Sequence, residues 1–207
     1  MGKLTLTTFL TLDGVMQGPG GPDEDPGDGF AHGGWLAPFA DEDMGRFMSE
    51  VFDRSAAFLL GRRTYDIFVA HWPKVTDPGD PVAARLNAHP KYVVSTTLKD
   101  PDWRHTTVVS ADVPAEVARL KERTEGGELQ IHGSGALARS LMAHDLIDEY
   151  NLLIYPVVLG RGRRLFPDGG PPTSFEPTGA RTTSSGIAIH TYRPVGRPRY
   201  GSLALED

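Results

Sequence analysis

The sequence contains no cysteine, although it is 207 residues long. Disulfide bonds, thiolate nucleophiles and cysteine-ligated metals are therefore excluded. Its seven histidines show none of the spacings H-x-H, H-x-x-x-H or H-E-x-x-H that are typical of zinc sites. We therefore expect no metal ion.

Long hydrophobic runs are missing as well. No run approaches the ~18 apolar residues that a membrane-spanning helix needs, and the start "MGKLTLTTFL" is not a secretory signal. Positive charge is in the minority, because 21 Lys and Arg face 27 Asp and Glu, which gives a net charge of -6. A nucleic-acid-binding protein usually shows the opposite balance. We expect a cytoplasmic protein that binds a small molecule, with no nucleic-acid or membrane partner.

Hydrophobic periodicity indicates an α/β protein. A chain of this length is typical of one domain, here with a core of about residues 3–193 and a tail at 194–207. Strands and helices alternate from residue 56 to 158, which predicts a largely parallel sheet flanked by helices. Residues 175–193, around "SSG", indicate a C-terminal antiparallel hairpin. The expected strands are 3–10, 56–60, 91–95, 106–110, 128–131 and 147–158, and the expected helices are 41–54, 61–71, 81–88, 114–123 and 134–143.

A segment rich in glycine and proline follows the first strand, from Asp13 to Trp35. A loop of this length is usually a binding loop, a lid or a disordered insertion. Aromatic and apolar residues interrupt it, which favours a functional loop. Asp13 begins it in "TLDGV", where a carboxylate at a strand end can orient a substrate or relay a proton. The alternative is an ordinary Asp-Gly turn.

Three strand ends carry groups that suit a phosphate or a ribose. The turn "GSGALA" at residues 133–138 matches G-x-G-x-x-A, but it comes late, and no acidic residue follows about 20 positions on, so a classical dinucleotide-binding domain is rejected. Its glycines and free helix N–H groups would still suit an anion. The alternative is a plain strand-to-helix turn with Ser134 as its cap.

The other two strand ends are "LLGRRTYD" and "VVSTTL". Arg62 and Arg63 stand at a helix N-terminus, where the helix dipole disfavours a cation unless an anion binds there. Ser95 and Thr96 follow a buried strand, and ligands of open α/β sheets bind beyond such ends. The agreement of the three strand ends indicates one extended ligand.

Four stretches together resemble a known family: "TLDGVMQGPGGPDED", "LLGRRTYDIF", "KYVVSTTL" and "LQIHGSGALARSLMAHDLIDEYNLLIYPVVLGRGRRLF". They are similar to the dihydrofolate reductase-like superfamily. The resemblance is to the reductase domain of the bifunctional riboflavin-biosynthesis deaminase–reductase, in a stand-alone form. It covers about residues 3–193 and implies a three-layer sandwich with NADPH across the strand ends.

The resemblance also implies a role for each motif. The cofactor contacts come from four segments, namely Gly14, Val15, Gln17 and Gly18 beside the nicotinamide, Gly61, Arg62, Arg63 and Thr64 at phosphates, Ser95 and Thr96 at the adenosine ribose, and Gly133, Ser134, Gly135, Ala136 and Leu137 at the pyrophosphate. Asp13 is the expected catalytic residue, as an acid or an orienting group, and Asp13 and Trp35 are the expected substrate contacts. Relatives indicate a homodimer.

The implied function is reduction, by NAD(P)H, of a small polar heterocycle that is pyrimidine- or pterin-like, or of its ring-opened sugar. The model activity is that of 5-amino-6-(5-phosphoribosylamino)uracil reductase. NADH stays open as a cofactor, because no arginine or lysine directly follows Ser95, although Arg62 or Arg63 could supply the charge. FMN stays open as well. The alternative is a nucleotide- or flavin-binding protein of the same fold without this activity.

Overall fold

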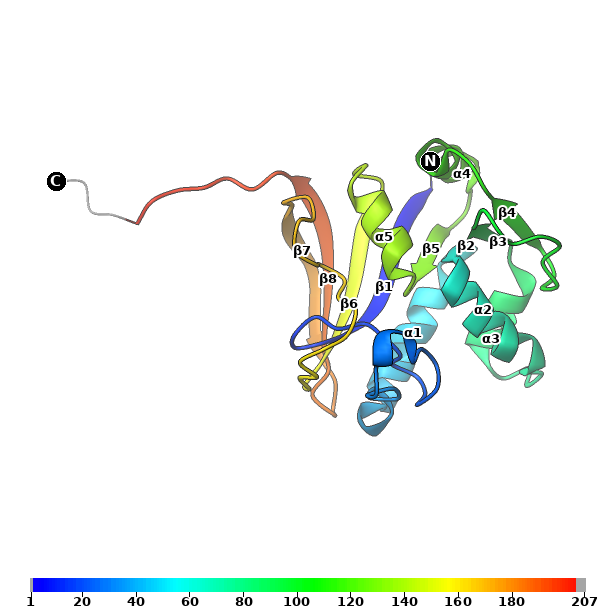
Figure 1. Cartoon of the computed structure of the whole chain (residues 1–207), viewed down its shortest axis with the longest axis horizontal. Coiled ribbons are helices and arrows are strands. Elements are labelled where there is room, and N and C mark those ends of the chain that lie inside the picture. Colours follow the sequence, from blue (N-terminus) through cyan, green and yellow to red (C-terminus); the bar gives the residue numbers. More distant parts are fainter. Residues whose placement is uncertain (1, 204–207) are drawn as a thin grey trace.

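The computed structural model describes residues 2–203. Eight strands form one sheet in the order β4-β3-β2-β5-β1-β6-β8-β7. The strands are β1 (Lys3–Thr11), β2 (Ser55–Gly61), β3 (Lys91–Val94), β4 (Thr106–Val109), β5 (Glu128–His132), β6 (Glu149–Tyr155), β7 (Ser174–Thr182) and β8 (Ala188–Gly196). Figure 1 shows the sheet running across the molecule, with the C-terminal tail leaving beyond β7 and β8.

Helices cover both faces of this sheet. They are α1 (Glu42–Asp53), α2 (Arg62–His71), α3 (Pro81–Ala88), α4 (Val113–Arg123) and α5 (Gly135–Met142), with short 3-10 turns at Gly27–Gly29, Ala37–Phe39 and Trp72–Lys74. Helix α1 begins where expected, because the Asp41 carboxylate accepts the N–H of Met44. Within residues 2–203, no helix is long and apolar enough to span a membrane.

The strand directions confirm the predicted α/β architecture. All pairings from β4 through β6 are parallel, whereas β8 runs antiparallel to both β6 and β7. Strand β1 pairs with β5 only as far as Thr7 opposite His132, and then continues along β6 to Thr11. The two central strands therefore separate at their carboxyl ends, where the ligand site of such a sheet is expected.

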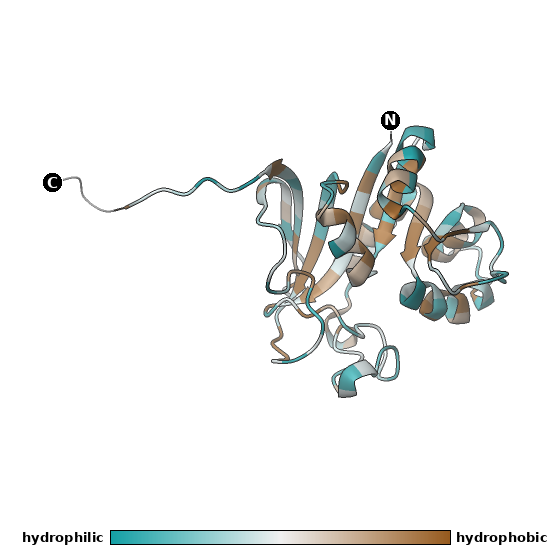
Figure 2. Cartoon of the chain, turned by 45° about the horizontal axis from the view of Figure 1, so that its top comes forward, coloured by the Kyte–Doolittle hydropathy of each residue, from teal (hydrophilic) through white to brown (hydrophobic). Residues whose placement is uncertain are grey.

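The two faces of the central strands differ in character. On the side of α4 and α5, Leu6 and Ile131 belong to a large apolar cluster. On the side of α1, the same strands present Gln130 and His132, which are also buried. Gln130 donates to the carbonyl of Val51 in α1, at 2.6 Å. Figure 2 shows the apolar colouring concentrated along the strands and the hydrophilic colouring on the outer sides of helices.

Two expected element boundaries are wrong. The strand expected over 147–158 is limited to Glu149–Tyr155, and the following residue, Pro156, has no N–H with which to extend the ladder. The hairpin is longer than expected, because β8 continues to Gly196. The segment taken as tail therefore begins inside a strand.

Candidate cofactor and substrate site

Two strand-to-helix turns meet at the carboxyl edge of the sheet. Ser134 joins them, because its hydroxyl accepts the N–H of Gly61 at 3.0 Å, while its own N–H donates to the hydroxyl of Thr64 at 3.2 Å. The alternative, in which the Ser134 side chain only caps α5, is not what the structure shows, since the residue is left-handed, with φ 51°, and forms no side-chain cap hydrogen bond. We call Gly61–Thr64 and Gly133–Leu137 together the glycine cradle.

The cradle offers backbone donors rather than side chains. Gly133 has φ 60°, which favours glycine, and with Ser134 it turns the chain into α5. The first N–H groups of α5, at Gly135, Ala136 and Leu137, have no intrahelical acceptor. The Ala136 side chain is exposed, whereas that of Leu137 is in the core, so Leu137 presents only its backbone. Such an arrangement suits an anion.

Met16 closes one side of the cradle. A Cβ atom on Gly135 would lie 2.6 Å from the sulfur of Met16 and 3.2 Å from Nη1 of Arg139. A side chain at position 135 would therefore clash with Met16 and displace it. Gly61 is less confined, because its nearest such contact is with Ser134 at 3.6 Å.

The end of β3 lies beside the α2 turn. The Ser95 hydroxyl accepts the N–H groups of Thr97 and Leu98, at 3.2 and 3.0 Å, so it shapes the turn, while Thr96 is exposed. Arg62 reaches this end of the sheet, because its Nη1 donates to the Thr97 hydroxyl at 3.3 Å. Asp66 holds the Arg62 guanidinium in place at 2.8 and 2.9 Å.

Asp13 lies just beyond the end of β1, and both of its carboxylate oxygens accept hydrogen bonds. Partial burial raises the pKa of Asp13, but hydrogen bonds from the Thr11 hydroxyl and from the N–H groups of Leu159 and Gly160 outweigh it and lower the pKa to about 2. Those bonds measure 2.5, 3.2 and 2.9 Å. Asp13 is therefore ionised near neutral pH, which suits an orienting group and not a proton donor.

The loop from Asp13 to Trp35, which we call the covering loop, is ordered around a buried amide. Gln17 donates to the carbonyls of Asp25 and Gly27, at 3.1 and 2.9 Å, and accepts the N–H of Arg163 at 3.0 Å. Gly14 and Gly18 take left-handed φ angles of 77° and 55° in its turns.

Two residues of the covering loop point inward. The Val15 side chain is fully buried. Trp35 has only 7% of its surface exposed, donates from Nε1 to the Gln17 carbonyl at 2.8 Å, and packs edge-on against Tyr155. The indole therefore supports the covering loop, and the role of Trp35 as a substrate contact stays a prediction. Val15 can meet a cofactor only through its backbone.

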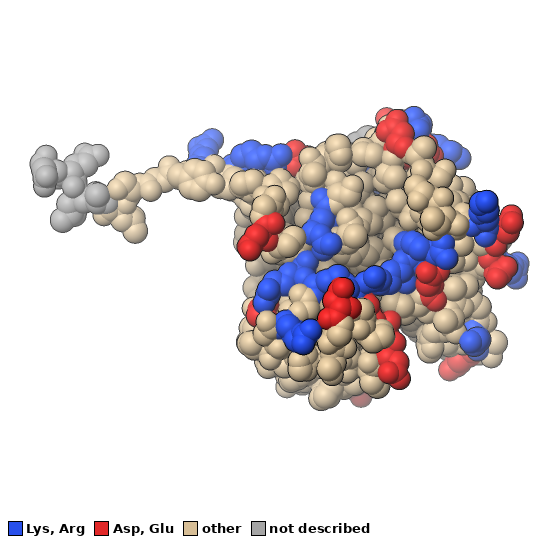
Figure 3. All heavy atoms as spheres, viewed as in Figure 1, with Lys and Arg blue, Asp and Glu red and all other residues tan. Residues whose placement is uncertain are grey.

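A band of arginines crosses the site, and sequence reasoning did not use most of it. Figure 3 shows Lys and Arg side chains continuing across this face of an acidic protein. Six arginines of this region form hydrogen bonds or ion pairs with its loops and strand ends: Arg62, Arg63, Arg139, Arg161, Arg163 and Arg164. Three of them come from "GRGRRLF", where the local density of arginine was the available signal.

Acidic residues of the covering loop occupy part of this arginine band. Asp25 pairs with Arg163 and, at 3.4 Å, with Arg63, while Asp28 pairs with Arg163 at 2.7 Å. Partial burial raises the pKa of Asp25, but the two arginines lower it further, to below its ordinary value. Arg164 donates from Nε to the backbone carbonyl of Asp13 at 2.7 Å. The band thus holds the covering loop against the cradle.

The fold and the family together define the class of this protein. The sheet, its helices and its C-terminal antiparallel strands match the dihydrofolate reductase-like fold of solved structures. The chain also matches the model of the RibD C-terminal domain over residues 2–189. It belongs to that family, which supports an oxidoreductase of the riboflavin-biosynthesis reductase type.

Two relatives in Bacillus subtilis (strain 168) are similar over nearly the whole chain. YyaP is 28% identical over 192 residues, which cover 92% of this chain and 94% of YyaP. YwjB is 26% identical over 191 residues, which cover 92% of this chain and 98% of YwjB. Both are described as uncharacterized proteins, so they add no activity.

Three solved structures share the fold. A putative riboflavin biosynthesis protein from Shewanella sp. PV-4 has a TM-score of 0.65 at 18% identity, over 93% of this chain and 98% of that one. A pyrimidine reductase-like protein from Corynebacterium diphtheriae has a TM-score of 0.62 at 11% identity, over 94% and 92%. A deaminase/5-amino-6-(5-phosphoribosylamino)uracil reductase from Thermotoga maritima has a TM-score of 0.61 at 16% identity, over 93% of this chain and 56% of that one.

Proposed function

We propose that the protein is an NADPH-dependent reductase, with the cofactor extended along the carboxyl edge of the sheet. One observation carries this proposal. The strand order β3-β2-β5-β1 sets the four expected cofactor segments side by side, in the order adenosine ribose, phosphate, pyrophosphate, nicotinamide. These strands span three spacings, about 14 Å. If the strands lay in sequence order, the β1 segment would lie beside β2 and not beside β5.

The residues present fit such a cofactor. The glycine cradle supplies the N–H groups at the start of α5 for the pyrophosphate, and the missing side chain of Gly135 leaves room for Met16 beside them. Arg62 lies beside Ser95 and Thr96, where it would meet a phosphate on the adenosine ribose. When bound, the nicotinamide supplies the hydride, while the protein supplies position and electrostatics.

Asp13 would act by orienting. It fixes the backbone at Leu159 and Gly160, and through Arg164 it ties that segment to the covering loop. Its side chain keeps 18% of its surface exposed, where a substrate could donate a hydrogen bond from a ring N–H or a hydroxyl. Because its pKa is about 2, the proton for the reduced product comes from another donor.

The substrate that fits is a small polar heterocycle, pyrimidine- or pterin-like, reduced at a C=N bond or at the C=O of its opened sugar. Family membership and the pyrimidine reductase-like neighbours support this class. The reaction of 5-amino-6-(5-phosphoribosylamino)uracil reductase, a name carried by the Thermotoga structure, is the first to test.

A second candidate is a nucleotide- or flavin-binding protein of the same fold without this reductase activity. One observation favours it: the expected catalytic residue, Asp13, cannot donate a proton near neutral pH. Under this reading the glycine cradle would still bind phosphates.

Thermal unfolding with NADPH, NADH, FMN and no ligand separates the two candidates. A ligand at 100 times its Kd stabilises by ~2.7 kcal/mol, so NADPH should raise the Tm by several degrees. Oxidation of NADPH, followed at 340 nm with the pyrimidine intermediate or dihydrofolate, then tests reduction. Asp13→Ala should lower kcat at least tenfold and leave NADPH binding nearly unchanged. Full turnover in Asp13→Ala would remove Asp13 from the mechanism. A shift with FMN alone would favour the second candidate.

A further inference from the structure

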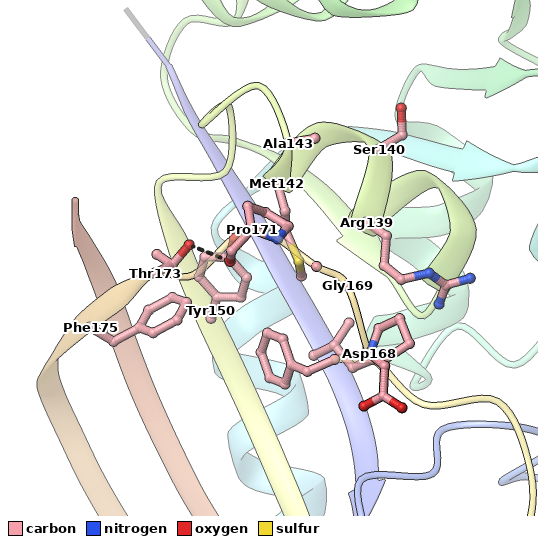
Figure 4. A pocket seen from close by; sticks show the side chains of 14 residues that line it. Arg139, Ser140, Met142, Ala143, Tyr150, Asp168, Gly169, Pro171, Thr173 and Phe175 are labelled. Carbon is pink, nitrogen blue, oxygen red and sulfur yellow. Dashed lines mark hydrogen bonds between the residues drawn. The ribbon is translucent and has the colours of Figure 1, made fainter. Parts of the chain in front are cut away.

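Two places near α5 differ in whether a ring of the bound cofactor belongs there. One is an apolar pocket of about 620 Å³ between α5, the start of β6 and the segment 165–173, which we call the α5 pocket. Figure 4 shows Met142 and Tyr150 at its centre and Phe175 on its β7 side. It is lined by Met142 and Ala143, at the C-terminal end of α5, whereas the glycine cradle lies at the N-terminal end of that helix. The ring of a cofactor seated in the cradle therefore belongs to the second place.

The second place is the point at which β1 and β5 separate, on the side of the sheet that faces α1. The last paired residues are Thr7 and His132, and the N–H of Gly133 donates to the Thr7 carbonyl at 3.0 Å. Beyond this bond β5 turns into the glycine cradle, while β1 continues along β6. His132 is therefore the last side chain of β5 before the proposed cofactor site.

The hydrogen bonds along β5 fix which nitrogen of His132 carries its proton. Gln130 donates from Nε2 to the Val51 carbonyl at 2.6 Å and to the Glu128 carboxylate at 3.0 Å. The Gln130 oxygen therefore faces His132, and because this oxygen can only accept, the bond of 3.1 Å requires a proton on Nε2 of His132. Burial lowers the pKa of His132 to about 3, so the ring is neutral near pH 7 and its Nδ1 is unprotonated.

The Nδ1 atom of His132 is an acceptor that no other described residue uses. Within residues 2–203 the ring forms its hydrogen bond through Nε2, and only 6% of the residue is exposed. Among the fully buried side-chain nitrogen and oxygen atoms of this range, only Thr106 Oγ1 lacks a partner, so Nδ1 belongs to the small surface that stays accessible. Because Nε2 points back to Gln130, Nδ1 lies on the other side of the ring, toward the carboxyl edge of the sheet.

Phe9 presents an aromatic surface on the same face of the sheet. Strand β1 is central, and Lys3 and Phe9 are its only residues that are not buried. Phe9 lies two residues beyond Thr7, so both side chains are on the same side of the strand. It packs edge-on against Tyr155, in the cluster that contains Val51 of α1. A partly exposed aromatic ring at this position suits contact with a planar ligand.

We propose that His132 orients the reacting ring, by accepting at Nδ1 a hydrogen bond from an N–H group of a planar ring that packs against Phe9. The inference rests on the proposed function, because the cradle must first bring a cofactor to this edge. Two sources carry the required N–H, namely the carboxamide of the nicotinamide and the ring amide or amino group of a pyrimidine or pterin. A carbonyl oxygen at the same place would face the lone pair of Nδ1, so the contact also selects which edge of the ring turns inward.

The imidazole nitrogen signals of the isotopically labelled wild-type protein test the contact without any substitution. In the free protein, His132 should show a protonated Nε2 and an unprotonated Nδ1. NADP⁺ alone should move the Nδ1 signal if the nicotinamide is the donor. A shift that appears only when dihydrofolate or the pyrimidine intermediate is added to the NADP⁺ complex assigns the N–H to the substrate. His89, whose ring contacts Ser55 before the amino end of β3, is the internal reference and should not respond.

The outcomes of this titration separate the inference from the proposed function. If NADP⁺ binds but no ligand moves the Nδ1 signal of His132, the inference is overturned and the proposed function stands. A protonated Nδ1 in the free protein also overturns it. If NADP⁺ does not bind, both fail.

Two amide variants of His132 test the same atom by affinity. His132→Asn, whose amide oxygen can take the place of Nδ1, should keep the affinity for the responding probe within about threefold, whereas His132→Gln, whose amide takes the place of Nε2, should lose about tenfold. The probes are NADP⁺ and, with NADP⁺ bound, dihydrofolate. His89→Asn is the matched control and should bind both as the wild type does. Equal losses in His132→Asn and His132→Gln contradict the role of Nδ1.

A cofactor analogue isolates the hydrogen bond of the nicotinamide. The acetylpyridine analogue of NADP⁺ has a methyl group in place of the carboxamide NH₂ and keeps all the phosphates. If the nicotinamide is the donor, the wild type should bind this analogue about tenfold more weakly than NADP⁺. His132→Phe, which keeps an aromatic ring against Phe52, should bind the two equally. A preference for NADP⁺ that survives in His132→Phe shows that another group reads the carboxamide.

Discussion

The glycine cradle and the covering loop lie against each other but are built by different forces. The cradle is set by backbone conformation and by neutral hydrogen bonds of Ser134 to Gly61 and Thr64. The covering loop is held by the buried amide of Gln17 and by ion pairs of its acidic residues with the arginine band. The cradle is therefore preformed, whereas a phosphate and dissolved salt both compete for the contacts of the covering loop.

The largest expected effect comes from filling the cradle. Gly135→Val places a side chain where Met16 now lies, in front of the α5 N-terminus, and should weaken NADPH binding about 100-fold, or ~2.7 kcal/mol. Isothermal titration calorimetry measures it. Gly45→Val is the matched control, because Gly45 is also helical and a Cβ there meets nothing within 4 Å. Equal affinities of the two variants would remove the cradle from the cofactor site.

Loss of the buried Gln17 amide should unfold the covering loop before the rest of the molecule. Gln17→Ala leaves the N–H of Arg163 and two carbonyls without their partner, which should cost about 1–3 kcal/mol. Urea unfolding measures the loss, and limited proteolysis should cut within residues 18–34. Protection equal to that of the wild type would show that the ion pairs alone hold the loop.

The base of the cradle should be sensitive to acid through His132. Burial lowers the pKa of His132 to about 3, and its ring stacks on Phe52. Between pH 3 and the ordinary pKa of 6.5, the unfolded chain carries a proton on this histidine that the folded chain does not. The free energy of unfolding is therefore highest above pH 6.5, and it decreases by roughly 1.4 kcal/mol for each unit by which the pH falls below that value. His132→Gln should flatten unfolding free energies measured from pH 6.5 to 4.5. An unchanged slope in His132→Gln would contradict the account.

The two neighbouring arginines of α2 should differ in their effect on cofactor choice. Arg62 reaches Thr97 beside Ser95 and Thr96, while Arg63 turns to Asp25 in the covering loop. Arg62→Gln should therefore reduce the preference for NADPH over NADH about tenfold, or ~1.4 kcal/mol. Arg63→Gln should change it less. The reverse ranking of the two Kd ratios would place the ribose phosphate at Arg63.

The smallest effect is expected at Asp25. Asp25→Asn frees Arg63 and Arg163 from their shared carboxylate, and should strengthen NADPH binding two- to fivefold, or roughly 0.5–1 kcal/mol, as is usual for partly exposed ion pairs. The gain should shrink between 50 mM and 500 mM salt. Weaker binding in this variant would show that Asp25 positions the arginines rather than competing for them.

The sequence predicts local elements well, because their signals are local. Asp41 before an amphipathic run marks the start of α1, and Pro114 lies in the first turn of α4. The placing of phosphate-friendly groups at three strand ends also came from local patterns. That these ends adjoin in the order β3, β2, β5 follows from sheet topology, which no local pattern encodes.

The internal contacts of the covering loop could not be predicted from the sequence. Nothing in "VMQGPG" indicates that Gln17 is buried and binds three backbone groups, or that Trp35 folds back onto its carbonyl. Contacts between residues far apart in the chain decide both. The negative net charge of the chain likewise gives no indication of the arginine band, because the band forms only when α2, α5 and the segment after β6 come together.

The central claim is that one extended cofactor contacts three strand ends at once. The most direct measurement follows the backbone amide signals of the isotopically labelled protein by NMR during titration with NADPH. The account predicts saturating shifts, with a single Kd, at Gly61–Thr64, Ser95 and Thr96, and Gly133–Leu137 together. Shifts at only one of these turns, or shifts confined to the α5 pocket, would contradict it.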